Sequence, residues 1–282
     1  MINAKLTHIL DFHHCSRPQP KTSKFEIGLF ANLVPYKDGY VGASRCGAID
    51  FNDKINIINY DSKFKYIDNT EITKGEDPRC FLYKDIPHAL TWSPKNISSV
   101  TYFTYKVINL ITKEVVELNI DNVSNEEMHW QKLGKNWMPI VKDDILYFII
   151  TLEPDLNILK CNLDSGKCEW VTEYDTEKDN IPVTISRGGT PFLFNKKLES
   201  YIGIGHRTYD GNHHSPYLYT ISKDFKNVYV GEDLKSKYNA INDPLSIFQD
   251  VDGEFYCCIA VLNQASRSST SGFTSLYKIE FN

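Results

Sequence analysis

The chain has 282 residues, a formal net charge of −5 and an isoelectric point near 5.9, and 13% of its residues are aromatic. An acidic chain without a block of Lys and Arg is a poor match for bulk nucleic-acid binding, which needs a basic surface to release counterions from phosphates. The longest apolar runs, 145–152 and 256–262, are shorter than the roughly 20 residues that span a bilayer, so we expect no membrane span.

The predicted elements are strands throughout. Runs rich in Tyr, Phe, Ile and Val recur with turn residues between them, and a helical period of 3.6 is almost absent. A polar strand start followed by a hairpin returns about every 50 residues, which is typical of propeller blades. In chain order the five units are 25–60, 76–121, 135–171, 186–230 and 243–281.

This repeat predicts an all-β fold, a five-bladed β-propeller that forms a single domain over residues 1–282. Residues 1–25 are expected to pack on the propeller or to close it. A β-sandwich with unrelated turns is the alternative. Each unit begins with polar residues beside a proline, and the inner strands of a propeller converge on its axis. If the repeat is real, these five polar starts face one funnel.

The first residues do not show the apolar segment and small-residue cleavage site of a secretory signal peptide, so we expect a cytoplasmic protein. Seven cysteines fit no zinc spacing and favour a reducing compartment. Cys161 and Cys168 flank the turn at 164–166, and the sequence leaves open whether they form a disulfide. The adjacent histidines at 13–14 and 213–214 point apart on a strand and have no third ligand at a suitable spacing, so no metal site is predicted.

Carboxylates and cations in the predicted funnel suit glycoside chemistry. Asp77 is the candidate general acid, and Glu76, its neighbour along a strand, should point to the opposite side. An ion pair with an arginine is the structural alternative for Glu76 and Asp77. Several cations at the unit starts would suit a phosphate, a sugar phosphate or the diphosphate of an activated sugar.

Four segments carry a family resemblance: Gly75-Glu76-Asp77-Pro78-Arg79, Lys135-Asn136-Trp137-Met138-Pro139, Arg187-Gly188-Gly189-Thr190-Pro191 and Tyr201-Ile202-Gly203-Ile204-Gly205-His206. The series resembles the five-bladed propeller β-mannoside phosphorylases and β-mannosidases of glycoside hydrolase family 130, whose propeller related mannosyltransferases share. The resemblance implies that Asp77 is the general acid. It also implies phosphate-binding positions at Lys135, Arg187 and His206. Further substrate-binding residues are expected at Asn32, Arg45, Glu76, Arg79, Asn136, Trp137 and Asp243.

The segment 151–154 departs from this pattern. Glu153 stands where mannoside phosphorylases often carry a basic residue, and a carboxylate there would repel phosphate. Glu153 could instead activate water for inverting hydrolysis or orient an acceptor hydroxyl. The cations at the unit starts favour phosphate or a phosphorylated donor, so we expect inverting glycosyl transfer or phosphorolysis on a β-mannoside-type sugar. Inverting hydrolysis with Glu153 as base and noncatalytic glycan binding are the alternatives.

No cofactor is expected, although inorganic phosphate, a sugar phosphate or a nucleotide sugar could serve as a co-substrate. The expected partner is an oligosaccharide or another glycan. The sequence leaves the sugar, the linkage, the acceptor and the oligomeric state open.

Overall fold

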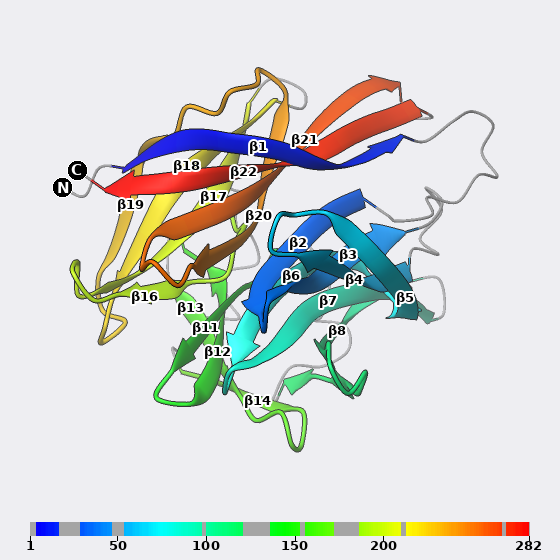
Figure 1. Ribbon diagram of the computed structural model, residues 1–282. Coiled ribbons are helices and arrows are strands. Elements are labelled where there is room, and N and C mark those ends of the chain that lie inside the picture. Colours follow the sequence, from blue (N-terminus) through cyan, green and yellow to red (C-terminus); the bar gives the residue numbers. More distant parts are fainter. Residues whose placement is uncertain are drawn as a thin grey trace.

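The computed structural model describes residues 4–16, 29–46, 54–97, 100–120, 136–152, 156–171, 186–209, 213–266 and 269–281. Every secondary-structure element in these ranges is a β-strand. The strands form a five-bladed β-propeller (Figure 1), which confirms the predicted fold class. No helix in the described part of the chain has the length and apolar character needed to cross a membrane.

The first two blades are four-stranded antiparallel sheets in simple chain order. The first contains β2 (Leu29–Tyr36), β3 (Gly39–Cys46), β4 (Lys54–Asp61) and β5 (Tyr66–Lys74). The second contains β6 (Glu76–Tyr83), β7 (Ile86–Ile97), β8 (Val100–Asn109) and β9 (Val115–Glu117). The predicted first unit ended at residue 60, so the structure extends it by one outer strand.

The third blade is also antiparallel and receives one further strand from the end of the second. Its own strands are β11 (Met138–Lys142), β12 (Ile145–Thr151), β13 (Asn157–Cys161) and β14 (Lys167–Trp170). The short strand β10 (Asn119–Ile120) pairs in parallel with β14. This pairing links the second and third blades at their outer edge.

The last two blades form one nine-stranded sheet. The fourth contains β15 (Ser186–Arg187), β16 (Leu193–Asn195), β17 (Ser200–Tyr209), β18 (His213–Ser222) and β19 (Val228–Asp233). The fifth contains β20 (Ile241–Gln249), β21 (Phe255–Ser266), β22 (Ser269–Phe281) and β1 (Ala4–Ser16). A parallel pairing of His214 with Ile241 joins the two blades and brings β18 beside β20.

Strand β1 is the outermost strand of the fifth blade. It runs antiparallel to β22, with Ala4 opposite Phe281, and Figure 1 shows the two strands side by side. The fifth blade therefore combines strands from both ends of the chain.

A polar cluster holds β1 in place. The Asp11 carboxylate accepts hydrogen bonds from His8 Nε2 (2.7 Å), Ser275 Oγ (2.7 Å) and Tyr238 Oη (2.5 Å). Burial alone would raise the pKa of Asp11, but the hydrogen bonds from Tyr238, His8 and Ser275 outweigh it and lower that pKa well below its ordinary value of 3.8. The ionised carboxylate thus ties β1 to β22 and to the segment before β20.

Tight hairpins explain why the blades repeat. Residues 84–85 between β6 and β7, and residues 143–144 between β11 and β12, all have φ between 51° and 60°. Two-residue loops with positive φ at both positions match the right-handed twist of the flanking strands. Asp tolerates this conformation better than most residues, because its short polar side chain can bond locally. The same local chemistry therefore closes the first hairpin of two successive blades.

The core lies between neighbouring blades, where apolar faces of adjacent sheets pack together. Between the second and third blades, Trp137 stacks on Tyr105 with ring centroids 3.5 Å apart and an interplanar angle of 9°. Both rings are at most 1% exposed. Near the axis, β6 lies against the inner strands β2, β11 and β20. This arrangement brings the polar starts of those strands together.

Candidate active site

Residues from all five blades line one pocket of about 120 Å³ near the axis. Its lining residues are Phe30, Asp77, Arg79, Asn136, His206, His214, Asp243 and Leu245. The first, second and fifth blades contribute from their inner strands, and the third contributes the residue two positions before β11. The fourth contributes from β17 and β18 instead. Segments from all five blades thus meet at one site, although the first and fourth blades contribute other residues than their predicted polar starts.

Three residues of this pocket have left-handed backbone conformations. The φ angles are 64° at Phe30, 45° at Asp77 and 75° at Asn136. Such conformations cost on the order of 1–3 kcal/mol each in a residue with a side chain, and they cluster at ligand-binding and catalytic sites. Their gathering around one pocket marks it as the candidate active site.

Register shifts accompany these conformations. The pairing of β6 with β7 slips between Glu76 and Arg79, and the pairing of β20 with β21 slips between Pro244 and Ser246. Each slip coincides with an Asp-Pro pair, at 77–78 and 243–244. Bulges of this kind redirect side chains, and proline within a sheet is confined to such places. A bulge at an Asp-Pro pair therefore directs each of the two aspartates toward the pocket.

Arg45 on β3 bridges two neighbouring carboxylates of the second blade. Its Nη1 lies 3.0 Å from Asp77 Oδ1, and its Nη2 lies 3.0 Å from Glu76 Oε2. The expectation that Glu76 and Asp77 point to opposite sides is wrong, because the left-handed backbone at Asp77 interrupts the alternation of the strand. A single guanidinium thus fixes the orientation of both acids.

Arg79 is buried beside them, with 5% of the residue exposed. Its Nη1 donates to the Pro78 carbonyl (3.0 Å), and its Nη2 donates to Asn136 Oδ1 (3.3 Å). Burial lowers the pKa of Arg79, and the charges of Asp77 and Asp243 oppose that shift. Because an arginine keeps its proton in proteins, the site contains a permanent buried positive charge.

Two histidines and an aspartate form the opposite wall. His214 Nδ1 contacts Asp243 Oδ1, and His206 Nε2 lies 4.0 Å from the same oxygen. The two imidazole rings stack with centroids 4.7 Å apart at an angle of 25°. Burial raises the pKa of Asp243, but the hydrogen bond from His214 and the charges of His206 and Arg79 more than offset it, so the pKa lies below its ordinary value.

This trio is the group among the described residues that could hold a metal ion, since its ligand atoms lie within 4.8 Å of one another. The sequence predicted no metal site because no third ligand stood near the paired histidines at 213–214. That ligand, Asp243, comes from the next blade, about thirty positions along the chain. His214 was not assigned to the site from sequence, although strand alternation turns one of two adjacent histidines toward the axis.

The structure brings most of the predicted site residues together. Asp77, Arg79, Asn136, His206 and Asp243 line the pocket. Glu76 lies behind it and, like Asp77, pairs with Arg45.

Two predicted substrate-binding residues lie in the interior instead. Asn32 is fully buried and Trp137 is 1% exposed. Neither residue lines the axial pocket, although Trp137 borders a small cavity beside it together with Asp77, Arg79 and Asn136. Lys135 and Glu153 lie outside the described residues, and only the backbone of Arg187, in β15, is described.

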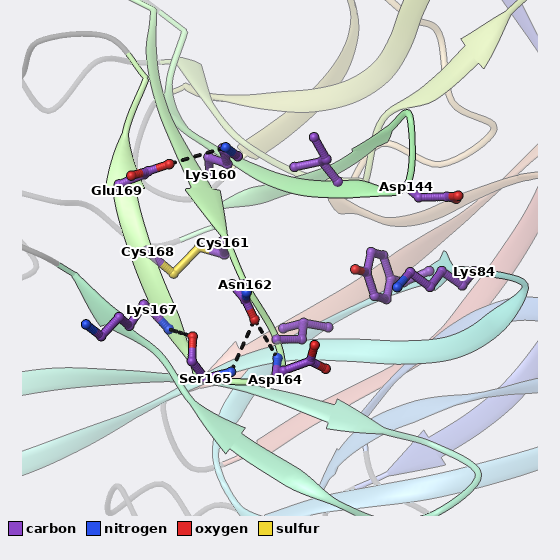
Figure 2. A pocket seen from close by; sticks show the side chains of 13 residues that line it. Lys84, Asp144, Lys160, Cys161, Asn162, Asp164, Ser165, Lys167, Cys168 and Glu169 are labelled. Atoms are coloured by element: carbon purple, nitrogen blue, oxygen red, sulfur yellow. Dashed lines mark hydrogen bonds and ion pairs between the residues drawn. A yellow bond between two sulfur atoms is a disulfide. The ribbon is translucent and has the colours of Figure 1, made fainter.

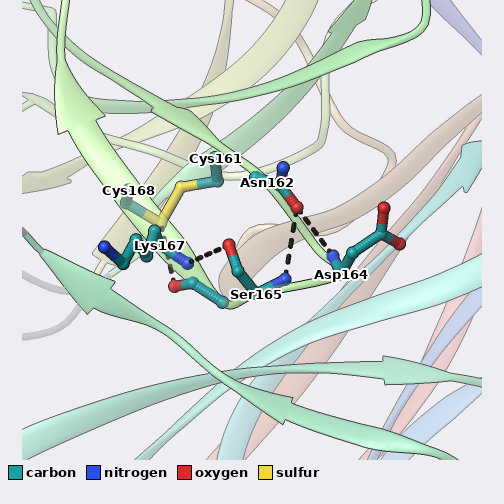
Figure 3. The surroundings of a disulfide bond; sticks show 7 residues. Cys161, Asn162, Asp164, Ser165, Lys167 and Cys168 are labelled. Carbon is teal, nitrogen blue, oxygen red and sulfur yellow. Dashed lines mark hydrogen bonds between the residues drawn. A yellow bond between two sulfur atoms is a disulfide. The ribbon is translucent and has the colours of Figure 1, made fainter.

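A second hollow, of about 460 Å³, lies away from the axis. The β13–β14 hairpin forms much of it, with Lys84 and Asp144 opposite (Figure 2). Cys161 and Cys168 face each other across this hairpin and form a disulfide (Figure 3). The question that the sequence left open is thus answered. None of the predicted site residues lines this hollow.

No protein-family model matches the chain, and no curated protein matches it in sequence. Solved structures do resemble it. The catalytic domain of the Coprinopsis cinerea GH62 α-L-arabinofuranosidase has a TM-score of 0.59 at 7% identity, covering 95% of this chain and 97% of that one. The GDP-Man-dependent mannosyltransferase MPT-1 from Leishmania mexicana has a TM-score of 0.54 at 10% identity, covering 91% and 90%.

A GH43 protein from Bacillus licheniformis has a TM-score of 0.55 at 12% identity. The match covers 87% of this chain but 52% of that protein, so the present chain spans about half of its length. At these identities the likeness is one of fold. The propeller is therefore of the type found in carbohydrate-active enzymes, both hydrolases and a glycosyltransferase.

Proposed function

We propose that this protein is a carbohydrate-active enzyme that catalyses inverting glycosyl transfer or phosphorolysis on a β-mannoside-type sugar, with Asp77 as the general acid. The observation that carries the proposal is the position of Asp77. Its carboxylate reaches the axial pocket from a left-handed backbone position and is oriented by Arg45. A carboxyl group at the wall of a pocket with other polar side chains supports this role, because a general acid must lie within hydrogen-bond reach of the leaving oxygen.

The proposed reaction needs two groups on opposite faces of the sugar. Asp77 gives its proton to the glycosidic oxygen as the bond from that oxygen to the anomeric carbon breaks. A phosphate oxygen forms the new bond from the other face, which inverts the configuration. Transfer from a phosphorylated donor is the reverse reaction: the acceptor hydroxyl attacks the anomeric carbon and gives its proton to the Asp77 carboxylate while the phosphate leaves. Arg45 contacts Asp77 Oδ1 and so orients the carboxyl group.

Positive charge near the pocket supports a phosphate-bearing substrate. Arg79 is buried at the pocket wall, and His206 lines the pocket. We propose that His206 acts with Lys135 and Arg187 to hold inorganic phosphate or the phosphate of a donor sugar. Guanidinium, ammonium and imidazolium groups all donate charge-assisted hydrogen bonds to phosphate oxygens. The roles of Lys135 and Arg187 rest on the resemblance of their segments to the mannoside phosphorylases.

Inverting hydrolysis is the second candidate, and the similarity to GH43 and GH62 hydrolases favours it. In that case Glu153 would activate water in place of phosphate. The two candidates differ in what attacks the sugar, so the requirement for phosphate or for an acceptor distinguishes them.

The test uses the full chain with manno-oligosaccharides, with and without inorganic phosphate, and with GDP-mannose plus a mannoside acceptor. Proton NMR identifies the product and its anomeric configuration. We expect turnover that requires phosphate or an acceptor, with the new bond of opposite configuration. Release of free mannose without either points to hydrolysis. A protein that binds manno-oligosaccharides and turns over none of these substrates is a glycan-binding propeller instead.

Asp77→Asn tests the assignment of the acid. Loss of a general acid lowers kcat by about 10²–10⁴-fold. The matched control is Asp68→Asn, because Asp68 is an exposed carboxylate on β5 that accepts a hydrogen bond from Asn59 at 2.6 Å. This control should keep the wild-type rate. Unchanged turnover in Asp77→Asn would show that another group supplies the proton.

A further inference from the structure

The wall opposite Asp77 has the composition of a metal site. His206 comes from β17, His214 from β18 and Asp243 from β20. The parallel contact between β18 and β20 holds the three together across the boundary of the fourth and fifth blades. Both histidines direct a ring nitrogen at the same carboxylate oxygen, His214 through Nδ1 and His206 through Nε2. Three potential ligands therefore converge from three strands.

Small side-chain movements would bring these atoms around one ion. Zinc binds imidazole nitrogen and carboxylate oxygen at roughly 2.0–2.2 Å in a tetrahedral arrangement, so two of its ligand atoms lie about 3.3–3.5 Å apart. His206 Nε2 and Asp243 Oδ1 are 4.0 Å apart, and all three ligand atoms lie within 4.8 Å of one another, so the wider gaps must close by up to about 1.5 Å. The hydrogen bond between His214 Nδ1 and Asp243 Oδ1 must open by a similar amount to admit the ion.

Asp243 is the carboxylate of the site that Arg45 does not contact. Among the side chains that the structure describes there, two arginines, Arg45 and Arg79, accompany three carboxylates, those of Glu76, Asp77 and Asp243. Arg45 pairs with the other two acids. In the described part of the chain, the ion-pair partners of Asp243 are the two histidines, and the charge of Arg79 also acts on its carboxylate. Asp243 thus stands beside two imidazoles that can act as further ligands.

We propose that His206, His214 and Asp243 form a binding site for one divalent transition-metal ion of the zinc type. Two imidazoles and one carboxylate suit zinc and its neighbours, whereas calcium and magnesium prefer all-oxygen ligands. Three protein ligands leave a coordination position open, as in catalytic rather than structural sites. Because the trio lines the pocket that also contains Asp77 and Arg79, this position faces the place where a substrate would bind.

The inference goes beyond the proposed function and is independent of it, because metal binding is measured without any substrate. It changes one detail of that function. With a metal bound, His206 would bind the ion, and the ion would contact the phosphate oxygen.

The test uses isothermal titration calorimetry. The chelator-treated full chain is titrated with zinc chloride and, in parallel experiments, with calcium chloride and with magnesium chloride. We expect one zinc ion per chain and no binding of the other two ions at the same concentrations. Asp243→Asn and His214→Gln should each weaken zinc binding by more than the roughly 10–100-fold that loss of an outer-shell partner costs. Thermal unfolding without metal checks that both variants fold.

His8→Gln is the matched control. It removes a histidine that also contacts an aspartate, Asp11, at 2.7 Å but that belongs to no three-ligand group in the described residues. Zinc affinity should be unchanged in this variant. The proposal is overturned if the wild-type chain binds no zinc, or if Asp243→Asn and His214→Gln bind it as tightly as the wild type.

A measurement on the wild-type chain covers the case in which the variants fail to fold. X-ray absorption at the zinc edge should show nitrogen and oxygen ligands with two imidazoles. A sulfur ligand would place the ion at a cysteine and would contradict the proposal.

Discussion

The ion-pair bridge made by Arg45 should contribute strongly to stability and can be tested by Arg45→Met. Methionine keeps most of the side-chain volume and removes the charge. The variant leaves Glu76 and Asp77 next to each other without the guanidinium that now lies 3.0 Å from each. Two adjacent carboxylates then repel each other, and Glu76 cannot gain compensating water because 6% of its side chain is exposed.

The size of the effect follows from burial. Breaking a buried ion pair costs about 3–5 kcal/mol, whereas an exposed pair contributes about 0–1 kcal/mol. The side chains of Arg45 and Asp77 are 26% and 17% exposed, so the bridge lies nearer the buried limit. We therefore expect a loss of about 2–4 kcal/mol. At about 2 °C per kcal/mol for a chain of this size, Tm should fall by roughly 4–8 °C.

Thermal unfolding followed by circular dichroism measures this change. The matched control is Lys54→Met in the same blade. It breaks an exposed ion pair with Glu71, whose side chain is 56% exposed, and should change Tm by less than about 2 °C. Adding Glu76→Gln to Arg45→Met should recover about 1–2 kcal/mol, because the double variant removes one of the two adjacent negative charges that lose Arg45. Equal effects of Arg45→Met and Lys54→Met, or no recovery in the double variant, would refute this reasoning.

Three further substitutions test the fold. Asp11→Asn should lower stability near pH 7, and the difference should start to shrink as the pH falls below 3.8 and be lost only as it falls through the depressed pKa of the folded protein; urea unfolding at several pH values measures this. Gly42→Ala would place a methyl group 1.7 Å from the Asn32 carbonyl oxygen, so the midpoint of urea unfolding should fall by the equivalent of at least about 1–3 kcal/mol. Replacing Cys161 and Cys168 together by serine opens a short loop and should cost about 2–3 kcal/mol, measured under oxidising conditions; an unchanged Tm would contradict the disulfide.

The repeat that organises the fold could be predicted because polar residues beside a proline, followed by a hairpin, return near the start of each blade. Strand β6 begins at Glu76 and β15 at Ser186, where the second and fourth units were predicted to begin. Strand β5 was not predicted. Its residues are mostly exposed or half-buried and show no continuous apolar face, because it is the outer strand of its blade. Outer strands therefore carry a weaker sequence signal than inner ones.

The candidate site was predicted less completely than the fold. Polar residues beside prolines correctly indicated that Asp77 and Asp243 lie near each other at the axis. Side-chain direction could not be inferred, because bulges and left-handed residues interrupt strand alternation where the site forms. This explains why Glu76 and Asp77 share Arg45, and why Asn32 points into the interior. His214 contacts Asp243 because β18 of the fourth blade lies beside β20 of the fifth. The spacing of the two residues along the chain does not reveal this contact.

The central claim is that Asp77 protonates the leaving oxygen, and the dependence of the Asp77→Asn defect on the leaving group tests it most directly. The assay compares kcat/KM for a manno-oligosaccharide, whose leaving alcohol needs a proton, with that for dinitrophenyl β-mannoside, whose leaving group does not. We expect a loss of about 10²–10⁴-fold on the first substrate and little loss on the second. An equal loss on both substrates, or none on either, would contradict the assignment of Asp77 as the general acid.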